Sequence, residues 1–380
     1  MAAELDSDRA RATYARQRIE VALEGSPFEA IVAISPENTR YASGVWVATQ
    51  QTLRDRLALV VWPKSGQPTL IVCNIEEGYC RSQSWISDIR AYAEHLQSPI
   101  ALLAQVLREK RLDRSRIGME TGYLSARFWN ELIQMLPNAV FEPAEPIFDQ
   151  ARMIKSPEEI RRLAEGSLVT EQALLATYLC TRPGETERSL AQRLTANLLL
   201  MGADSVPFLH IPAGPNTGFP HPPATDYQVK EGDLVKTDFG GSFDGYVSDR
   251  ARTMVVGKPS PEQVSLYACL VEIHNETLQA ANPGVPASEI FRVARAGYRR
   301  LKVPFDPPHA GHGLGLSVHE PPMLSPAFLT ELVPGMVLAI ETRVRIPGEY
   351  GMHIEDLVEI TADGHRVHTR NFPYESLLAV

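Results

Sequence analysis

The stretch Asp238-Phe-Gly-Gly-Ser-Phe-Asp-Gly-Tyr-Val-Ser-Asp249 has an aspartate at each end and an Asp-Gly turn signal between them. The runs Leu234–Phe239 and Tyr246–Val256 have the composition of strands, so the stretch predicts a β-hairpin. With a turn centred near Phe243–Asp244, the terminal aspartates would lie opposite each other, with Cβ atoms about 5 Å apart. If the two aspartates are buried, one of them must take up a proton or the pair must bind a cation. Two solvent-facing aspartates need neither. Both possibilities stay open at this point.

A second hairpin repeats this arrangement. The runs Val337–Arg345 and Met352–Thr361 flank the turn Pro347-Gly-Glu349, and they carry Glu341 and Glu355 about equally far from it. Glu341 directly follows the apolar run Leu-Ala-Ile, where a strand residue is expected to be buried. Carboxylates are almost never fully buried unless they are paired or ligated. Two hairpins with facing acids therefore favour a buried carboxylate cluster.

Three histidines accompany these acids in proline- and glycine-rich surroundings. His312 and His319 lie on the extended segment Gly311-His312-Gly-Leu-Gly-Leu-Ser-Val-His319-Glu320, where glycine permits close approach of the backbone to a site. His221 stands in the stiff loop Pro220-His221-Pro-Pro. A single histidine is more often structural than functional. Three of them beside four acids favour metal ligation and catalysis.

Four carboxylates and one imidazole form an oxygen-rich set that suits two divalent cations. Such a set favours Mn²⁺, Co²⁺ or Fe²⁺ over a zinc site rich in thiolates. Two ions roughly 3.5–4 Å apart would generate a bridging hydroxide at neutral pH and polarise a substrate carbonyl. The sequence therefore predicts a dinuclear hydrolytic centre.

Other catalytic motifs are missing from the sequence. Gly311-x-Gly-x-Gly differs from GxGxxG and leads to two prolines instead of a helix, which argues against a dinucleotide-binding loop. His319-Glu-Pro-Pro-Met lacks the second histidine of HExxH. Neither a GxSxG elbow nor a Walker phosphate loop occurs.

Length, composition and charge bound the class of protein. A chain of 380 residues is long enough for two domains. The net charge of −9 argues against a nucleic-acid-binding protein, which needs positive charge to bind phosphates. No apolar run approaches the roughly 20 residues of a membrane helix. The N-terminus lacks the pattern of a secretory signal, so we expect a cytoplasmic protein with neither nucleic acid nor membrane as a partner. Four scattered cysteines are expected to be free thiols: Cys73, Cys80, Cys180 and Cys269.

The chain is predicted to divide near residue 155. Before that point, short β-type runs alternate with helical patterns, which predicts an α/β domain with a mixed sheet over residues 1–150. A long helix is expected after Ser156-Pro-Glu-Glu159, because the serine caps it, the proline occupies its first position and the glutamates complement its dipole. The second domain, residues 155–380, holds the polar residues described above. Its further helices are expected near residues 187–202, 261–281 and 287–301.

Together these motifs resemble the pita-bread metallopeptidases, and within them the Xaa-Pro aminopeptidases and prolidases. The resemblance covers essentially the whole chain, because Ile34-Ser-Pro-Glu-Asn-Thr-Arg-Tyr-Ala-Ser-Gly44 and Arg152-Met-Ile-Lys-Ser-Pro-Glu-Glu-Ile160 are also similar to the family. It implies an α/β fold in which a creatinase/prolidase-type N-terminal domain with a mixed sheet precedes a pita-bread catalytic domain. The catalytic domain would have a curved antiparallel sheet flanked by helices. The resemblance also implies a homodimer and a small peptide or other small amide as substrate.

The resemblance implies a role for each polar residue of the two hairpins. Asp238 would bind one metal and Asp249 would bridge both. His312 would bind the other metal, Glu355 would bridge, and Glu341 would bind one ion and hold or deprotonate the bridging water. The implied cofactor is a pair of divalent ions, Mn²⁺ ahead of Co²⁺, Fe²⁺ or Zn²⁺. The implied reaction is hydrolysis of the amide bond of Xaa-Pro peptides by a metal-bridging hydroxide.

Two histidines would contact the substrate. By resemblance, His221 matches a histidine that contacts substrate or stabilises the tetrahedral intermediate, and His319 matches one that donates a hydrogen bond to the substrate carbonyl. The sequence departs from prolidases at two arginine positions, which are His353 and Met323 here. Methionine cannot form the bidentate pair with a carboxylate that arginine forms, which leaves Arg343 as a candidate replacement.

These departures keep two alternatives open. The same site would suit a hydrolase of a non-peptide small molecule, of the kind represented by ectoine hydrolases. A binding module that has kept the fold and lost activity would instead predict a damaged ligand set. The five intact ligand positions disfavour such a module, and they also disfavour a creatinase, which lacks the complete metal set.

Overall fold

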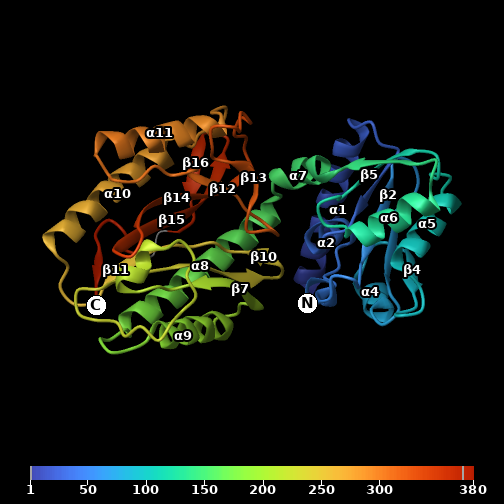
Figure 1. Ribbon diagram of the computed structural model, residues 1–380. Helices are drawn as coiled ribbons and strands as arrows, with labels where there is room; N and C mark the ends of the chain where they lie inside the picture. The colour runs from blue at the N-terminus through green and yellow to red at the C-terminus, as the bar shows by residue number, and fades with distance from the viewer. Residues whose placement is uncertain (1, 370–371) are drawn as a thin grey trace. The chain divides into compact units, whose positions relative to one another are not determined.

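The computed structural model describes residues 2–369 and 372–380 of the chain (Figure 1). The chain forms two compact units, Met1–Arg152 and Met153–Val380, each with its own sheets and hydrophobic core. None of the helices within the described ranges is long and apolar enough to cross a membrane.

The N-terminal unit is built on a six-stranded sheet with the order β4-β3-β2-β1-β5-β6. The central strand β1 pairs antiparallel with β2 and parallel with β5, so the predicted mixed sheet is confirmed. Strands β1 to β3 are fully buried and rich in apolar residues, as expected for strands covered on both faces. The strands are β1 Ala30–Ala33, β2 Leu59–Pro63, β3 Thr69–Cys73, β4 Asp88–Tyr92, β5 Arg116–Met119 and β6 Val140–Pro143. The helices are α1 Ala2–Glu24, α2 Pro36–Ser43, α3 Ala48–Thr52, α4 Glu77–Gln83, α5 Pro99–Glu109, α6 Ala126–Met135 and α7 Glu145–Met153.

A buried carboxylate anchors the helix that follows β1. Helix α2 has Ser35 as its N-cap and Pro36 at its start, and the Ser35 hydroxyl accepts a hydrogen bond from the backbone nitrogen of Asn38 at 3.2 Å. Glu120 accepts hydrogen bonds from the backbone nitrogen of Ser35 at 2.9 Å and from Asn38 Nδ2 at 2.7 Å. Burial raises the pKa of Glu120, and these donors oppose that shift. The Ser-Pro-Glu-Asn motif therefore stabilises the N-terminal unit.

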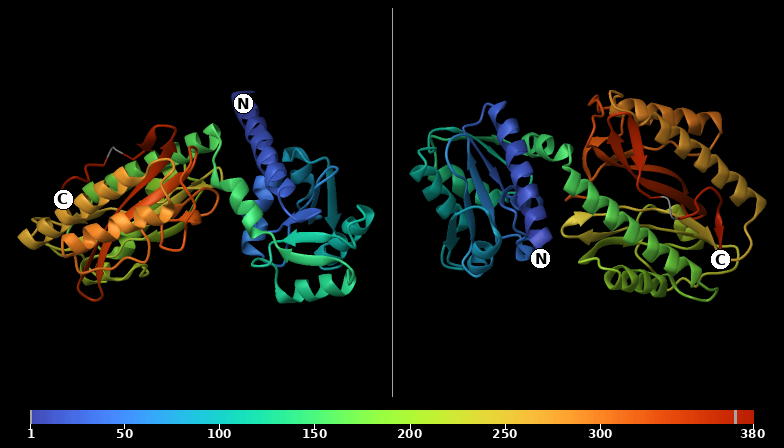
Figure 2. Two further views of the ribbon diagram at one scale, coloured as in Figure 1. Left: turned by 90° about the horizontal axis from the view of Figure 1, so that it is seen from above. Right: turned by 180° about the vertical axis from the view of Figure 1, so that it is seen from behind.

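The C-terminal unit places mostly antiparallel strands between two pairs of helices (Figures 1 and 2). Helix α10 packs on β14 and β15 with α11 beside it, whereas α8 packs on β9 and β10 and α9 on β7. The sheets have the orders β13-β12-β14-β15-β16, β10-β9-β7 and β17-β11-β8. The helices are α8 Pro157–Leu179, α9 Glu187–Leu200, η1 Gly214–Gly218, α10 Pro261–Ala280 and α11 Ala287–Arg300. The strands are β7 Ser205–His210, β8 Leu234–Lys236, β9 Asp238–Phe243, β10 Tyr246–Val247, β11 Thr253–Val255, β12 Gly311–Gly313, β13 Glu320–Met323, β14 Val337–Ile346, β15 Tyr350–Thr361, β16 Gly364–Val367 and β17 Leu378–Ala379.

Helix α8 begins with the predicted cap. The Ser156 hydroxyl accepts a hydrogen bond from the backbone nitrogen of Glu159 at 3.2 Å, and the Glu159 carboxylate accepts one from the backbone nitrogen of Ser156 at 2.7 Å. This reciprocal pair satisfies two backbone donors that a helix N-terminus otherwise leaves open. Ser260 and Gln263 form the same capping box at the start of α10.

The hairpin of β14 and β15 has the predicted register. Glu341 lies directly opposite Glu355, and Ile346 pairs with Tyr350 across the three-residue turn. Alternation along the strands puts the two carboxylates on one face of the sheet. The prediction that these acids face each other is confirmed.

The other hairpin differs from its prediction by one residue. Phe243 pairs with Tyr246, so the turn consists of Asp244 and Gly245, both with positive φ, of 48° and 75°. Such a two-residue turn with left-handed backbone matches the twist of a hairpin. The register therefore places Asp249 opposite Gly240 and makes Asp238 its diagonal neighbour, roughly 7–8 Å away on the same face. The prediction of directly opposed aspartates was wrong, and the diagonal leaves room between them.

Candidate active site

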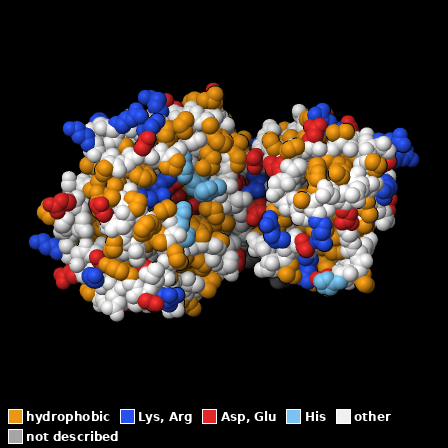
Figure 3. Space-filling view, viewed as in Figure 1, with side chains coloured by type: hydrophobic (Ala, Val, Ile, Leu, Met, Phe, Trp, Pro, Cys, Tyr) orange, Lys and Arg blue, Asp and Glu red, His pale blue; other side chains and the backbone are white. Residues whose placement is uncertain are grey.

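A cavity of about 620 Å³ lies in the C-terminal unit, within the size range of small-molecule sites. Figure 3 shows histidine side chains around a hollow that also holds acidic and basic side chains. A cavity of about 660 Å³ in the N-terminal unit contains charges that pair with one another, such as Arg56 with Glu94. The cavity in the C-terminal unit brings together all seven residues singled out in the sequence: His221, Asp238, Asp249, His312, His319, Glu341 and Glu355.

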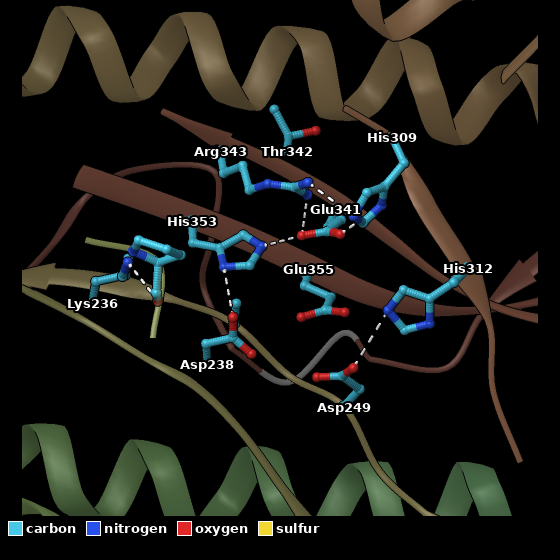
Figure 4. A network of polar contacts seen from close by, with 12 residues as sticks. Lys236, Asp238, Asp249, His309, His312, Glu341, Thr342, Arg343, His353 and Glu355 are labelled. Atoms are coloured by element: carbon cyan, nitrogen blue, oxygen red, sulfur yellow. Dashed lines mark hydrogen bonds and ion pairs between the residues drawn. The ribbon is translucent and has the colours of Figure 1, made fainter. Parts of the chain in front are cut away.

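Three of these residues form a candidate metal site. One ligand atom each from Asp249, His312 and Glu355 lies within 4.8 Å of the other two, and all three residues are buried. His312 Nδ1 donates a hydrogen bond to the carbonyl oxygen of Gly313 at 3.0 Å, which leaves the lone pair of Nε2 facing Asp249 Oδ2 at 3.6 Å. Figure 4 shows the three side chains converging, His312 from β12, Glu355 from β15 and Asp249 from the segment between β10 and β11.

The electrostatics of this trio fit a divalent cation. Burial, together with the charges of Asp238 and Glu341, raises the pKa of Asp249 well above its ordinary value. Burial and the charge of Asp249 likewise raise the pKa of Glu355. Burial lowers the pKa of His312 to about 4, so its imidazole is neutral at physiological pH. Asp249 Oδ1 is buried and has no hydrogen-bond partner among the described residues. A buried carboxylate oxygen without a donor is expected of a metal ligand.

Glu341 is instead surrounded by cationic and hydrogen-bonding groups. Arg343 forms an ion pair with its carboxylate, His353 Nε2 donates to Oε2 at 2.8 Å, and His309 Nδ1 lies 3.1 Å from Oε1. Burial alone would raise the pKa of Glu341, but Arg343 and His353 hold it well below its ordinary value. Glu341 is therefore an ionised carboxylate in this cavity.

Asp238 lies between two imidazoles. His221 Nε2 lies 3.4 Å from Asp238 Oδ2. His353 Nδ1 lies 3.6 Å from the same oxygen (Figure 4). Burial opposes ionisation, but the His221 hydrogen bond and the His353 charge lower the pKa of Asp238 overall. His353 thus bridges Asp238 and Glu341. It lies directly opposite Arg343 in the strand register, a juxtaposition that the sequence analysis did not identify.

The histidines form a closer group than the sequence predicted. The segment after His312 turns back as the hairpin of β12 and β13 instead of remaining extended, so the ring centroids of His312 and His319 lie 4.1 Å apart. Lys155 Nζ forms a buried ion pair with the neighbouring Glu320 at 3.0 Å, which holds this turn in place. The sequence analysis missed His309, whose ring centroid lies 6.3 Å from that of His312. The shared proline- and glycine-rich segment was the signal that could have found it.

The structure also shows whether His210 and Met323 contribute to the cavity wall. His210, which the sequence analysis also missed, lines the cavity with its ring centroid 4.9 Å from that of His221. Met323 pairs through its backbone with His312 but does not line the cavity. The side chain of Met323 therefore does not form part of the cavity wall.

A buried lysine holds the loop that carries His221. Lys236 Nζ donates to the carbonyl oxygens of Phe219 at 2.6 Å and Pro220 at 3.3 Å. Burial, followed by the charge of Arg345, lowers the pKa of Lys236 to about 7. Because the unfolded chain binds this proton up to a pKa near 10.4, folding becomes more favourable as pH rises from 7 towards 10.

Replacing Lys236 by methionine is therefore expected to remove part of this pH dependence. The free energy of unfolding of the metal-stripped wild type should rise relative to Lys236→Met by up to about 1.4 kcal/mol per pH unit between pH 7 and 10. Urea unfolding at several pH values measures the difference. Lys230 is exposed, so Lys230→Met should follow the wild type. Parallel profiles for wild type and Lys236→Met would contradict the expected shift.

A fully buried charge network lies behind the candidate ligands. Arg250 Nη1 and Arg252 Nη2 contact Asp356 Oδ1 at 2.6 and 2.5 Å, and His274 Nε2 contacts Asp356 Oδ2 at 2.9 Å. Both arginines also donate to the backbone carbonyl oxygen of Glu355, at 2.9 and 2.6 Å. Burial opposes ionisation of Asp356, but the two arginines hold its pKa well below the ordinary value. The network fixes the backbone on which Glu355 is carried.

Comparison with known proteins places the chain in a family. Residues 161–362 match the model of metallopeptidase family M24, and residues 16–154 match that of the creatinase/prolidase N-terminal domain. A protein of Lactobacillus helveticus named Xaa-Pro dipeptidase is 32% identical over 304 residues, covering 78% of this chain and 81% of the relative. A Pyrococcus furiosus protein of the same name is 33% identical over 237 residues, covering 60% and 67%. The crystal structure of dipeptidase PepE from Mycobacterium ulcerans superposes with a TM-score of 0.87 at 27% identity and covers 98% of both chains.

The match to family M24 covers more than half of the chain and includes every candidate ligand. The two-part architecture predicted by resemblance, a creatinase-like domain followed by a pita-bread domain, is confirmed by the two matches together with the fold. The family implies an enzyme that uses divalent metal ions. The chain belongs to metallopeptidase family M24.

Proposed function

We propose that this peptidase hydrolyses the amide bond before proline in small Xaa-Pro peptides, with two divalent ions in the cavity. The observation that carries the proposal is the buried trio of Asp249, His312 and Glu355, which has ligand atoms within 4.8 Å of one another and an unpartnered carboxylate oxygen. Asp238 and Glu341 line the same cavity and would complete the ligand set. The two relatives named Xaa-Pro dipeptidase favour this substrate over the non-peptide alternative.

The bound ions would supply a nucleophilic hydroxide at neutral pH and polarise the scissile carbonyl. Glu341 is kept ionised by Arg343 and His353, so its carboxylate would accept a hydrogen bond from the attacking water and orient it. His319 is exposed towards the cavity beside His312 and would donate a hydrogen bond to the carbonyl oxygen as negative charge develops there. His221 lies at Asp238 and would contact the substrate from the opposite loop.

Three further properties belong to this proposal. Manganese is the proposed ion, because the proposed ligands are carboxylate oxygens and a single imidazole. Such ligands suit Mn²⁺, whereas a thiolate-rich set would favour zinc. A reducing, cytoplasmic location is supported by the four cysteines, all of which are free thiols. A homodimer is proposed on the family resemblance alone.

Mn²⁺-dependent hydrolysis of a matched peptide set tests the substrate. After chelation and reloading, we expect cleavage of an Xaa-Pro dipeptide or its C-terminally extended tripeptide and no cleavage of the Xaa-Ala dipeptide. Activity should disappear with the chelator and return with the metal, because the ions supply the nucleophile. A protein that binds two metals and cleaves none of the three peptides would contradict the proposal and favour a non-peptide amide.

A further inference from the structure

One cation of the cavity wall has no partner among the residues that the structure describes. Glu341, Arg343 and Arg345 alternate along β14, so all three side chains project from the same face of the strand, and all three line the cavity. Arg343 is occupied by its ion pair with Glu341 and by a contact from Nη2 to His309 Nε2 at 3.1 Å. Arg345 makes no side-chain hydrogen bond or ion pair with the described part of the chain, and its Nε is buried without a partner.

The surroundings of Arg345 leave this guanidinium open towards the cavity. The residue directly opposite in β15 is Gly351, which has no side chain to pair with it. An added Cβ at Gly351 would come within 2.1 Å of the carbonyl oxygen of Thr217, so a larger residue does not fit there. Burial and the charge of Arg343 lower the pKa of Arg345, which marks a positive charge without its full counter-charge.

The charge balance of the cavity points the same way, and this step rests on the proposed function. Four carboxylates line the cavity, and two divalent ions would neutralise them. With the hydroxide that the proposed reaction requires, Arg343 and Arg345 would then leave one excess positive charge beside the site. Arg345 is half-buried, and a guanidinium partly withdrawn from water without a counter-ion is costly, so an anionic group on the substrate would lower that cost.

We propose that Arg345 binds the C-terminal carboxylate of the peptide substrate and so determines specificity for peptides that end shortly after the scissile bond. Arginine presents a planar pair of N–H donors that matches a carboxylate. The two positions at which prolidases carry arginine cannot serve, because Met323 does not line the cavity and both ring nitrogens of His353 face Asp238 and Glu341. Strand spacing puts the Cα atoms of Glu341 and Arg345 about 13 Å apart, and both side chains line the same cavity.

A comparison of acid and amide substrates tests this assignment on the metal-loaded enzyme. Alanyl-proline and alanyl-prolinamide differ only in the terminal negative charge. We expect wild-type kcat/KM to favour the acid by about 10- to 100-fold, as befits a hydrogen-bonded charge pair. In Arg345→Met the ratio should fall towards one, with most of the loss in KM, because the pair forms equally in ground and transition states. Arg345→Lys should retain part of the preference.

The matched control is Arg366→Met, an arginine on β16 whose side chain is exposed and does not line the cavity. This variant should keep the wild-type ratio. An equal rate on acid and amide by the wild type, or an unchanged preference in Arg345→Met, would overturn the assignment while leaving proline-directed cleavage intact. Cleavage of neither peptide by the wild type would overturn the proposed function itself. If Arg345→Met does not fold, an unchanged acid preference in Arg345→Lys with unchanged KM would overturn the assignment.

Discussion

Replacing Asp249 by asparagine is expected to abolish loading of two metal ions and to lower kcat/KM by at least about 1,000-fold, which corresponds to roughly 4 kcal/mol. Asp249 supplies ligand atoms to the buried trio, and its Oδ1 has no other partner among the described residues. Glu355→Gln should have the same effect, because Glu355 belongs to the same trio. Metal content after equilibrium dialysis and hydrolysis of an Xaa-Pro dipeptide measure both losses.

The same substitution should stabilise the metal-stripped protein. Asp249 is a carboxylate whose ionisation is opposed by burial and by the charges of Asp238 and Glu341, so a neutral amide relieves that conflict. The wild type should gain thermal stability on adding Mn²⁺, whereas Asp249→Asn should lose most of this gain. Asp226→Asn is the control, because Asp226 is exposed and does not line the cavity. Full turnover by an Asp249→Asn, Glu355→Gln double variant without bound metal would refute the dinuclear mechanism.

Replacing Asp356 by alanine is expected to lower the free energy of unfolding of the C-terminal unit by about 3–5 kcal/mol. The change removes the carboxylate that faces Arg250, Arg252 and His274, all of them fully buried. Two guanidinium groups would then be left in the interior without their shared counter-charge. Chemical denaturation of the metal-stripped protein measures the loss without interference from metal binding.

Asp356→Asn should lose less stability than Asp356→Ala, since the amide oxygen still accepts hydrogen bonds. Asp363→Ala provides a matched control, because Asp363 is exposed and its substitution should change stability by no more than about 0.5 kcal/mol. A loss below about 1 kcal/mol for Asp356→Ala would show that the network does not depend on its carboxylate.

Short-range patterns made parts of the fold and site predictable. The turn at Pro347–Glu349 fixes the register of its hairpin, so the pairing of Glu341 with Glu355 follows from counting outward from the turn. The start of α8 follows from the cap at Ser156. The hairpin that carries Asp249 was misplaced by one residue, because several residues near that turn have turn character and only backbone geometry selects Asp244 and Gly245.

The partners of the candidate site could not be predicted in the same way. His353 bridges Asp238 and Glu341 because β9 and β15, more than 100 residues apart, meet at the cavity. Nothing in the sequence near Arg343 or Arg345 distinguishes the arginine that is paired from the one that is not.

The sequence by itself determined the types of the longer elements, the alternation that puts acids on one face of each hairpin, and the set of candidate metal ligands. These depend on backbone propensity and on neighbours within a few residues, which the chain encodes locally. Only the tertiary structure decided that Asp249, His312 and Glu355 converge and that Lys236 holds the His221 loop. It also decided that Arg345 lines the cavity with no side-chain partner in the described part of the chain. These features depend on which strands pack together and on what burial then does to each charge, and a pattern of local residues does not specify either.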